Sequence, residues 1–213
     1  MVKEKLLANG VLTYPNIKLV YFDVGGVLFR FKGGLHDIAN KVGLSYENCE
    51  KIWLEMDDSI CRGETPPQEL WTRIKEASGY RGDDINFVSF LVDHFQPILK
   101  THKLVQDLSE HYCVGLLTNI YPGVYQLALE KGKIPNIPYA SVILSCEVGE
   151  IKPNSAIYEL AQQRGNVKPG EILFIDDSSR FITPAINLGW HTFLFDGRKA
   201  AKNVVNLRHA LGL

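Results

Sequence analysis

Unbroken apolar runs recur along the chain and predict the strands of a parallel sheet. Between the later runs, apolar residues recur at helical spacing over 123–132, 154–165 and 179–189. Continuous apolar strands that alternate with helices are typical of a parallel sheet covered by helices on both faces, so we predict an α/β fold with a Rossmann-like sheet. The predicted strands are KLVYFDV (18–24), YCVGLLTN (112–119), SVILS (141–145), EILFID (171–176) and HTFLFD (191–196).

The section between the first two runs has a different pattern, because helical periodicity replaces strand-like runs. The predicted helices span 35–43, 46–63, 66–79 and 83–95, and a fifth, 97–112, leads back into the second strand. We expect no strand in this section. The pattern predicts a helical-bundle subdomain, 34–96, inserted into an α/β core of 17–33 and 97–213, with 1–16 as an N-terminal extension. Trp53 and Trp71 lie on apolar helical faces and are expected to pack inside the insert.

Composition and charge disfavour some classes of protein but do not identify a reaction. The 213 residues include 23 Lys and Arg against 24 Asp and Glu, a formal net charge of -1 that disfavours nucleic-acid partners. No apolar run reaches the roughly 18–20 residues of a membrane span, and the first residues do not resemble a signal peptide. Four scattered cysteines fit free thiols in a reducing compartment. We expect a cytoplasmic protein without membrane partners, either a monomer or a homodimer.

Polar side chains stand where the predicted strands end. Asp23 ends the first, Thr118 and Asn119 the second, and Asp176 and Asp177 the fourth, while Lys152 precedes a helix in GEIKPNSAIY. In open α/β sheets, ligands bind at the carboxyl ends of the strands. Carboxylates and an ammonium gathered there need partners, and a hard cation such as Mg²⁺ with an anionic substrate would supply them.

Each of these residues has a plain structural explanation when it is taken alone. Asp23 could cap a strand end, Thr118 could serve a turn, and Lys152 could be a solvated surface lysine. Asp176 and Asp177 could cap the helix that starts near residue 178. The joint placement of all of them at strand ends favours the functional interpretation.

The same segments resemble the motifs of the haloacid dehalogenase-like hydrolase superfamily, over nearly the whole chain from about residue 19. YFDVGGVL resembles the first motif, LLTN the second, GEIKPNSAIYELA the third and ILFIDDSSRFITPAINLGW the fourth. The helical insert resembles the cap that closes over the site in this family and selects substrates. CRGETPPQELW at 61–71 also looks like cap sequence from this group.

The resemblance implies a Mg²⁺-dependent phosphatase that forms an aspartyl-phosphate and acts on a small phosphorylated metabolite, such as a sugar phosphate. It makes Asp23 the nucleophile, Thr118 the hydroxyl that hydrogen-bonds the transferring phosphoryl group, and Lys152 the cation that neutralises both. Mg²⁺ would be held by Asp23, the backbone carbonyl of Gly25, Asp176 and Asp177. The candidate substrate-binding residues are Asn119, Arg30 and Arg62, although Arg30 could be a solvated surface residue and Arg62 part of a helix-ending turn.

Two positions depart from the family pattern. The family's general acid stands two residues after the nucleophile, where this chain has Gly25, and a missing positioned acid typically costs ~10²–10⁴-fold in rate. Four residues past Asp177 the family usually has Asp or Asn, where this chain has Phe181, which offers no oxygen to a metal.

These departures keep two other functions open. A non-catalytic binding or regulatory protein could keep the fold without turnover, and the departures favour it. A 2-haloacid dehalogenase would not need an acid, since halide leaves without a proton, but it needs no metal and would leave the pair of Asp176 and Asp177 unexplained.

Overall fold

The computed structural model describes residues 5–6, 12–31 and 33–213, and its centre is a five-stranded parallel sheet. The strand order is β7-β6-β3-β8-β9, and every neighbouring pair is parallel. This confirms the predicted fold class and all five predicted strands. Their bounds are β3 (Leu19–Phe22), β6 (Cys113–Thr118), β7 (Ser141–Leu144), β8 (Ile172–Asp176) and β9 (His191–Leu194).

The sheet is buried on both faces, which explains why its strands are apolar throughout. In β3, Val20 and Phe22 join one buried cluster, while Leu19 and Tyr21 join a second cluster on the opposite face. Successive side chains of a strand point to opposite faces, so a strand that is covered twice needs apolar residues at every position. Burial of one large apolar side chain of this kind contributes roughly 1.5–3 kcal/mol.

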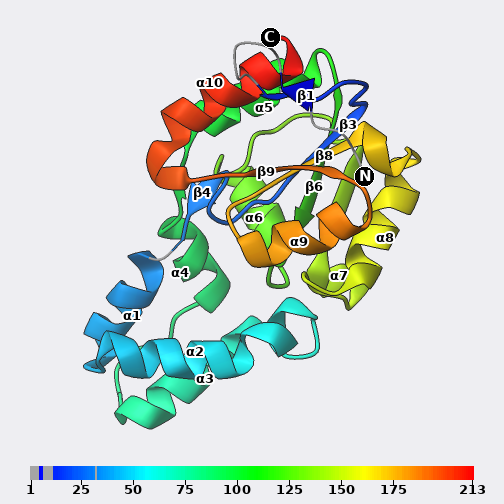
Figure 1. Ribbon diagram of the computed structural model, residues 1–213. Helices are drawn as coiled ribbons and strands as arrows, with labels where there is room; N and C mark the ends of the chain where they lie inside the picture. Colours follow the sequence, from blue (N-terminus) through cyan, green and yellow to red (C-terminus); the bar gives the residue numbers. More distant parts are fainter. Residues whose placement is uncertain (1–4, 7–11, 32) are drawn as a thin grey trace.

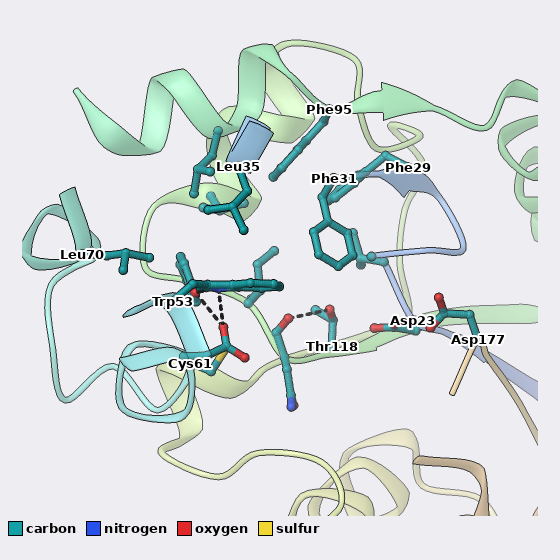
Figure 2. A pocket seen from close by; sticks show the side chains of 18 of the residues that line it. Asp23, Phe29, Phe31, Leu35, Trp53, Cys61, Leu70, Phe95, Thr118 and Asp177 are labelled. Carbon is teal, nitrogen blue, oxygen red and sulfur yellow. Dashed lines mark hydrogen bonds between the residues drawn. The ribbon is translucent and has the colours of Figure 1, made fainter. Parts of the chain in front are cut away.

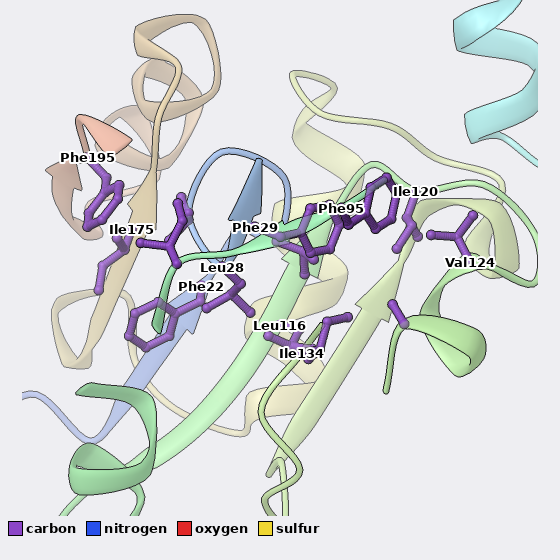
Figure 3. Packing of buried hydrophobic residues seen from close by; sticks show 14 of the residues in the cluster. Phe22, Leu28, Phe29, Phe95, Leu116, Ile120, Val124, Ile134, Ile175 and Phe195 are labelled. Atoms are coloured by element: carbon purple, nitrogen blue, oxygen red, sulfur yellow. The ribbon is translucent and has the colours of Figure 1, made fainter. Parts of the chain in front are cut away.

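Helices cover both faces of the sheet (Figure 1). Side chains of α5 (Leu99–Ser109), α6 (Val124–Glu130) and α10 (Ala200–Leu211) join the cluster that contains Phe22. Those of α8 (Ser155–Gly165) and α9 (Ser179–Asn187) join the other. Figure 3 shows part of the first cluster, which runs from Phe195 and Ile175 to Phe95, Ile120 and Val124.

Four helices form a separate layer beyond one end of the sheet (Figure 1). Ser45 and Asn86 cap the starts of two of these helices by accepting hydrogen bonds from the backbone N–H groups of Asn48 and Ser89. We call this layer, residues 33–93, the helical lobe. Its helices are α1 (Gly33–Val42), α2 (Tyr46–Cys61), α3 (Pro67–Ser78) and α4 (Phe87–Asp93), and all four were predicted.

The section between the first two predicted strands does contain strands, contrary to expectation. Two short strands, β4 (Phe29–Arg30) and β5 (Gln96–Pro97), form an antiparallel ladder that joins the start of the lobe to its end. Two-residue strands carry no periodic signal, because strand alternation needs about four residues to show.

The helix α10 was not predicted, although it carries apolar residues at helical spacing. Several short elements were also not predicted. They are α7 (Ser145–Val148), η1 (Pro169–Glu171), η2 (Gly197–Lys199) and the antiparallel pair β1 (Lys5–Leu6) and β2 (Leu12–Thr13). Of the predicted N-terminal extension, residues 1–4 and 7–11 lie outside the described residues. The division into core and insert as domains stays a prediction. Within the described ranges, no helix is both long and apolar enough to cross a membrane.

Candidate active site

The strand order brings the predicted catalytic residues together. β3 lies at the centre of the sheet with β6 and β8 on either side, so the three strands end side by side. Asp23 directly follows β3, Thr118 ends β6 and Asp176 ends β8. All three side chains are buried, with exposed fractions of 6%, 1% and 0%. Sheet order, which the sequence does not give, therefore turns three separate strand ends into one site.

Lys152 lies between two of the carboxylates. Its Nζ is 2.9 Å from Oδ1 of Asp23 and 2.6 Å from Oδ2 of Asp176, and its side chain is buried. Burial alone would lower the pKa of Lys152, but Asp23 and Asp176 together outweigh burial and raise it. For Asp23 the effect of burial has the opposite sign: it raises the pKa to about 7, although the Lys152 ammonium acts to lower it. Lys152 is therefore charged, and it holds Asp23 in place.

A third carboxylate completes a cluster with the chemistry of a metal site. Asp23, Asp176 and Asp177 each offer a carboxylate oxygen, and the three oxygens lie within 4.8 Å of one another. Oxygen ligands of this kind suit a hard divalent cation such as Mg²⁺. The carboxylates outnumber the single ammonium of Lys152, so the cluster has excess negative charge that a cation would neutralise.

Glycine at position 26 leaves room for this cluster. Gly26 has φ +80°, a conformation that residues with a side chain rarely adopt, and a Cβ there would collide with Oδ2 of Asp177. Oδ1 of Asp176 accepts a hydrogen bond of 2.8 Å from the backbone N–H of Ser178. The turn after β3 and the start of α9 thus fix the carboxylates from both sides.

Asn119 holds the loop that carries Lys152. Its Nδ2 donates to the backbone carbonyl of Lys152 at 3.0 Å, and its Oδ1 accepts from the backbone N–H of the same residue at 2.8 Å. Both polar atoms of the side chain are therefore already used. Asn119 lines the pocket, and its side chain holds the backbone of Lys152.

The two departures from the family pattern also lie at the site. Gly25 and Phe181 both line the pocket next to the carboxylates. The Phe181 ring centroid is 4.8 Å from Nζ of Lys152, within the range of a cation–π contact. The position of the family's Asp or Asn is thus taken by an aromatic ring that covers the lysine instead of contributing an oxygen.

The two predicted arginines have other partners. Arg30 is exposed and donates from Nη2 to the backbone carbonyl of Gly197 at 2.9 Å. Arg62 donates from Nη1 to the carbonyl of Gly149 at 3.1 Å and lies 3.5 Å from Glu150, so it joins α2 to the loop before Lys152. Neither arginine is among the residues that line the pocket, and this arrangement lends no support to a substrate role for them.

A cavity of about 280 Å³ opens from the carboxylates toward the helical lobe. Figure 2 shows Asp23, Thr118 and Asp177 on one side of it and Trp53, Cys61 and Leu70 of the lobe on the other. Its aromatic lining residues are Phe29, Phe31, Trp53, Phe87, Phe95 and Phe181, besides two tyrosines. The cavity therefore joins a charged end to a largely apolar wall.

A hydrogen-bonded group on that wall was not predicted from the sequence. Oδ1 of Asp57 accepts from Nε1 of Trp53 at 3.1 Å and from the hydroxyl of Tyr121 at 2.6 Å. Burial raises the pKa of Asp57, while the bonds from Tyr121 and Trp53 oppose the shift. Asp57 and Tyr121 are 64 positions apart in the chain, so no local pattern could have paired them.

Comparisons with known proteins agree with the fold. The family model described as haloacid dehalogenase-like hydrolase matches residues 17–189. Among solved structures, a predicted HAD-like family hydrolase from Porphyromonas gingivalis superposes with a TM-score of 0.70 at 22% identity, covering 90% of this chain and 98% of that one. A HAD family enzyme from Bacteroides thetaiotaomicron, in complex with magnesium and inorganic phosphate, gives 0.67 at 24% identity, covering 83% and 93%.

Curated relatives match over parts of their length. Mouse acyl-CoA dehydrogenase family member 10 is 29% identical over 86% of this chain, which spans only 18% of that protein. D-ribitol-5-phosphate phosphatase of Bacteroides thetaiotaomicron is 33% identical over 42% of this chain and 46% of its own length. The chain thus spans less than half of these relatives, and their activities belong to those proteins.

Proposed function

Because the chain belongs to the haloacid dehalogenase-like hydrolase family, we propose that it is a magnesium-dependent phosphatase that acts on a small phosphorylated metabolite. The observation that carries the proposal is the cluster at the sheet edge, where buried Lys152 contacts Asp23 and Asp176 and Asp177 completes a set of three carboxylates. A phosphatase relative and a structural neighbour with magnesium and inorganic phosphate support it.

In this proposal Asp23 attacks the phosphorus atom and forms an aspartyl-phosphate, which water then hydrolyses. Lys152 orients Asp23 and offsets the negative charge of nucleophile and phosphoryl group, which is the main task in phosphoryl transfer. Thr118, whose hydroxyl makes a long bond of 3.3 Å to the Asn119 carbonyl, turns toward a phosphoryl oxygen. Mg²⁺, held by Asp23, Asp176, Asp177 and the Gly25 carbonyl, would add positive charge where phosphate charge develops.

The leaving oxygen is the weak point of this chemistry. An alkoxide needs a proton as it departs, and Gly25 has no side chain to give one. A missing general acid costs ~10²–10⁴ in rate, or about 3–5 kcal/mol. We therefore expect the best turnover with phosphates whose leaving group needs no proton, such as aryl or acyl phosphates.

The helical lobe has the position of a cap in this proposal. Its residues form the wall of the cavity opposite Asp23. Ser145 connects lobe and core, since its hydroxyl donates to the Cys61 carbonyl at 2.6 Å and accepts from the Ile120 N–H at 2.9 Å. A lobe that covers the cavity would exclude water during phosphoryl transfer.

The test is hydrolysis of p-nitrophenyl phosphate at several Mg²⁺ concentrations by the wild type, Asp23→Asn and Asp83→Asn. The aryl leaving group barely needs an acid, so Gly25 is not limiting. We expect Mg²⁺-dependent turnover that falls at least about 10³-fold in Asp23→Asn, because the nucleophile is lost. Asp83 is exposed on the lobe, and its variant is the control that should match the wild type.

The competing function is a binding or regulatory protein without turnover, which Gly25 and Phe181 favour. Mg²⁺-dependent hydrolysis that disappears in Asp23→Asn rejects this alternative. Absence of hydrolysis by a folded wild type, even with the aryl substrate, rejects the phosphatase.

A further inference from the structure

The wall of the cavity differs from what a sugar phosphate would need. Recognition of a sugar requires donors and acceptors for its hydroxyl groups, because hydroxyls that lose water without gaining partners are costly to bury. Opposite Asp23, the cavity is instead lined by Phe31, Leu35, Trp53, Leu70 and Leu91. Figure 2 shows Phe31, Leu35, Trp53 and Leu70 around the space beyond Asp23 and Thr118.

The polar side chains that line the cavity already have hydrogen-bond partners within the protein. Tyr46 donates its hydroxyl to Glu50 at 2.8 Å, and Tyr121 donates to Asp57 at 2.6 Å. The indole N–H of Trp53 donates to the Tyr121 hydroxyl at 2.6 Å and also to Asp57 at 3.1 Å, and Asn119 is engaged by the backbone of Lys152. The donor groups of Tyr46, Tyr121 and Trp53 therefore already have acceptors, which leaves a sugar few donors in the part of the chain that the structure describes.

The shape of the cavity fits a compact apolar group. Its volume of about 280 Å³ is at the small end of ligand sites, which typically span ~300–1,000 Å³. The charged end can hold a phosphoryl group, and the rest is bounded by aromatic and branched side chains from the lobe, from β4 and from residues next to the ladder. Phe31 and Trp53 meet edge to face, with centroids 6.2 Å apart, and form a continuous apolar surface.

We propose that the substrate is the phosphate ester of a small, apolar organic group, and that the group packs against Phe31, Leu35 and Trp53 while its phosphoryl end lies at Asp23. The proposal rests on the proposed function for the reaction, but the ligand class follows from the cavity wall alone. It replaces the sugar phosphate expected from the family resemblance with a monoester that has few or no free hydroxyls. Binding and turnover can therefore be tested separately.

The first experiment measures binding of ethyl-, butyl- and hexylphosphonate to the wild-type chain by isothermal titration calorimetry with Mg²⁺ present. Phosphonates are not hydrolysed, so leaving-group chemistry does not enter the result. We expect affinity to rise about threefold to fourfold for each added methylene until the cavity is full, as apolar burial predicts. A series with flat or falling affinity overturns the proposal.

The second experiment compares hexylphosphonate with ribitol 5-phosphate on Asp23→Asn, which prevents turnover of the ester. We expect the alkyl ligand to bind at least about tenfold more tightly. Tighter binding of the polyhydroxylated ligand overturns the apolar class and leaves the phosphatase proposal intact. Conversely, a rising phosphonate series in a chain that never hydrolyses p-nitrophenyl phosphate supports the apolar site and rejects the phosphatase.

A substitution in the apolar wall of the cavity tests where the alkyl chain of the ligand binds. Leu35→Ala is expected to weaken hexylphosphonate binding about fivefold or more and ethylphosphonate binding less, because only the longer chain reaches the wall. Leu54→Ala is the matched control, since Leu54 lies beside Trp53 in the sequence of α2 but is 64% exposed and does not line the cavity. Equal losses for both ligands in Leu35→Ala would assign the loss to the fold and contradict the proposed wall, and thermal melting checks the fold independently.

Discussion

The two sides of the cavity differ in chemistry and in origin. The side with Asp23, Thr118 and Lys152 comes from strand ends and the loops after them, and it is charged and buried. The opposite side comes mainly from an insert between two strands, and it is apolar, with polar groups that bond to one another. In our proposals, the strand ends carry out the reaction and the insert selects the molecule that undergoes it. The predictions below test that division of roles.

The largest effect is expected at the centre of the charged side. Lys152→Met removes the cation between Asp23 and Asp176, leaves two buried carboxylates facing each other, and should lower the free energy of unfolding by about 3 kcal/mol. Hydrolysis of p-nitrophenyl phosphate should fall ~10²–10³-fold, since charge stabilisation of the phosphoryl group is lost. Urea denaturation and steady-state kinetics measure the two effects. Lys103→Met, at an exposed pair with Asp107, should cost at most about 1 kcal/mol, and an equal cost for both variants would contradict this interpretation.

A gain of function is expected where the two sides meet. Gly25→Asp places a carboxyl at the family's acid position, and an ideal Cβ there comes within 3.3 Å only of the Phe31 ring, which has to give by a few tenths of an ångström. The rate with an alkyl phosphate should rise by up to about 10²-fold, while the rate with p-nitrophenyl phosphate should change little. Gly25→Asn has a similar shape but cannot donate a carboxyl proton. Equal gains in the two variants would show that proton transfer is not the missing step.

A smaller effect is expected from substitution of Gly26 than from the changes above, and substitution of the neighbouring Gly25 should have almost none on Mg²⁺ binding. Gly26→Ala forces a side chain into a positive-φ conformation and against Asp177, so we expect a cost of about 1–2 kcal/mol and about tenfold weaker Mg²⁺ binding. Gly25→Ala should leave Mg²⁺ affinity close to that of the wild type, since the Cβ contacts only Phe31. Titration calorimetry with Mg²⁺ compares the three proteins. Similar affinities in both variants would argue that Asp177 does not contribute to the metal site.

The smallest effect is expected on the apolar side, from the charge of Asp57. Burial raises the pKa of Asp57 in the folded state. At pH values above the ordinary Asp pKa, the folded state therefore binds more protons than the unfolded state. The free energy of unfolding then falls as pH rises through the folded-state pKa of Asp57. Asp57→Asn removes this loss and keeps an oxygen for Tyr121 and Trp53, so its stability relative to the wild type should improve with rising pH by no more than about 1 kcal/mol. Chemical denaturation from pH 4 to 8 measures the trend. Asp83→Asn, at an exposed position of the lobe, is the control, and parallel profiles for the wild type and Asp57→Asn would exclude the effect.

The sequence was sufficient to predict which side chains gather on the charged side, because its signals are local. Each residue there stands at the end of its own apolar run, and the carboxyl ends of parallel strands meet at one edge. The order of the strands was not needed to select Asp23, Thr118 and Asp176, although it explains why they meet. Asn119 shows the limit of such reasoning, because only the structure reveals that its amide is used by the backbone of Lys152.

The apolar side could not be predicted to the same depth. Trp53 and Trp71 both lie on apolar helical faces, and both were expected inside the insert. Trp71 is fully buried, whereas Trp53 is half-buried and lines the cavity. Helical periodicity identifies the inward face of a helix but does not tell whether that face meets other side chains or an open space. The pairing of Asp57 with Tyr121 depends on tertiary contact and has no signature in either segment.

The short ladder of β4 and β5 has a consequence for how proteins with this fold can evolve. Phe29 pairs with Pro97 and Arg30 with Gln96, so the polypeptide leaves the core and returns to it at the same place. Closure of a flexible loop costs only about 0.6 kcal/mol more for each doubling of its length, so the segment between these two points can be lengthened, shortened or exchanged at little cost to the rest. Lineages can thus replace the insert as one module, while the strand pairing that aligns Asp23, Thr118 and Asp176 is inherited unchanged.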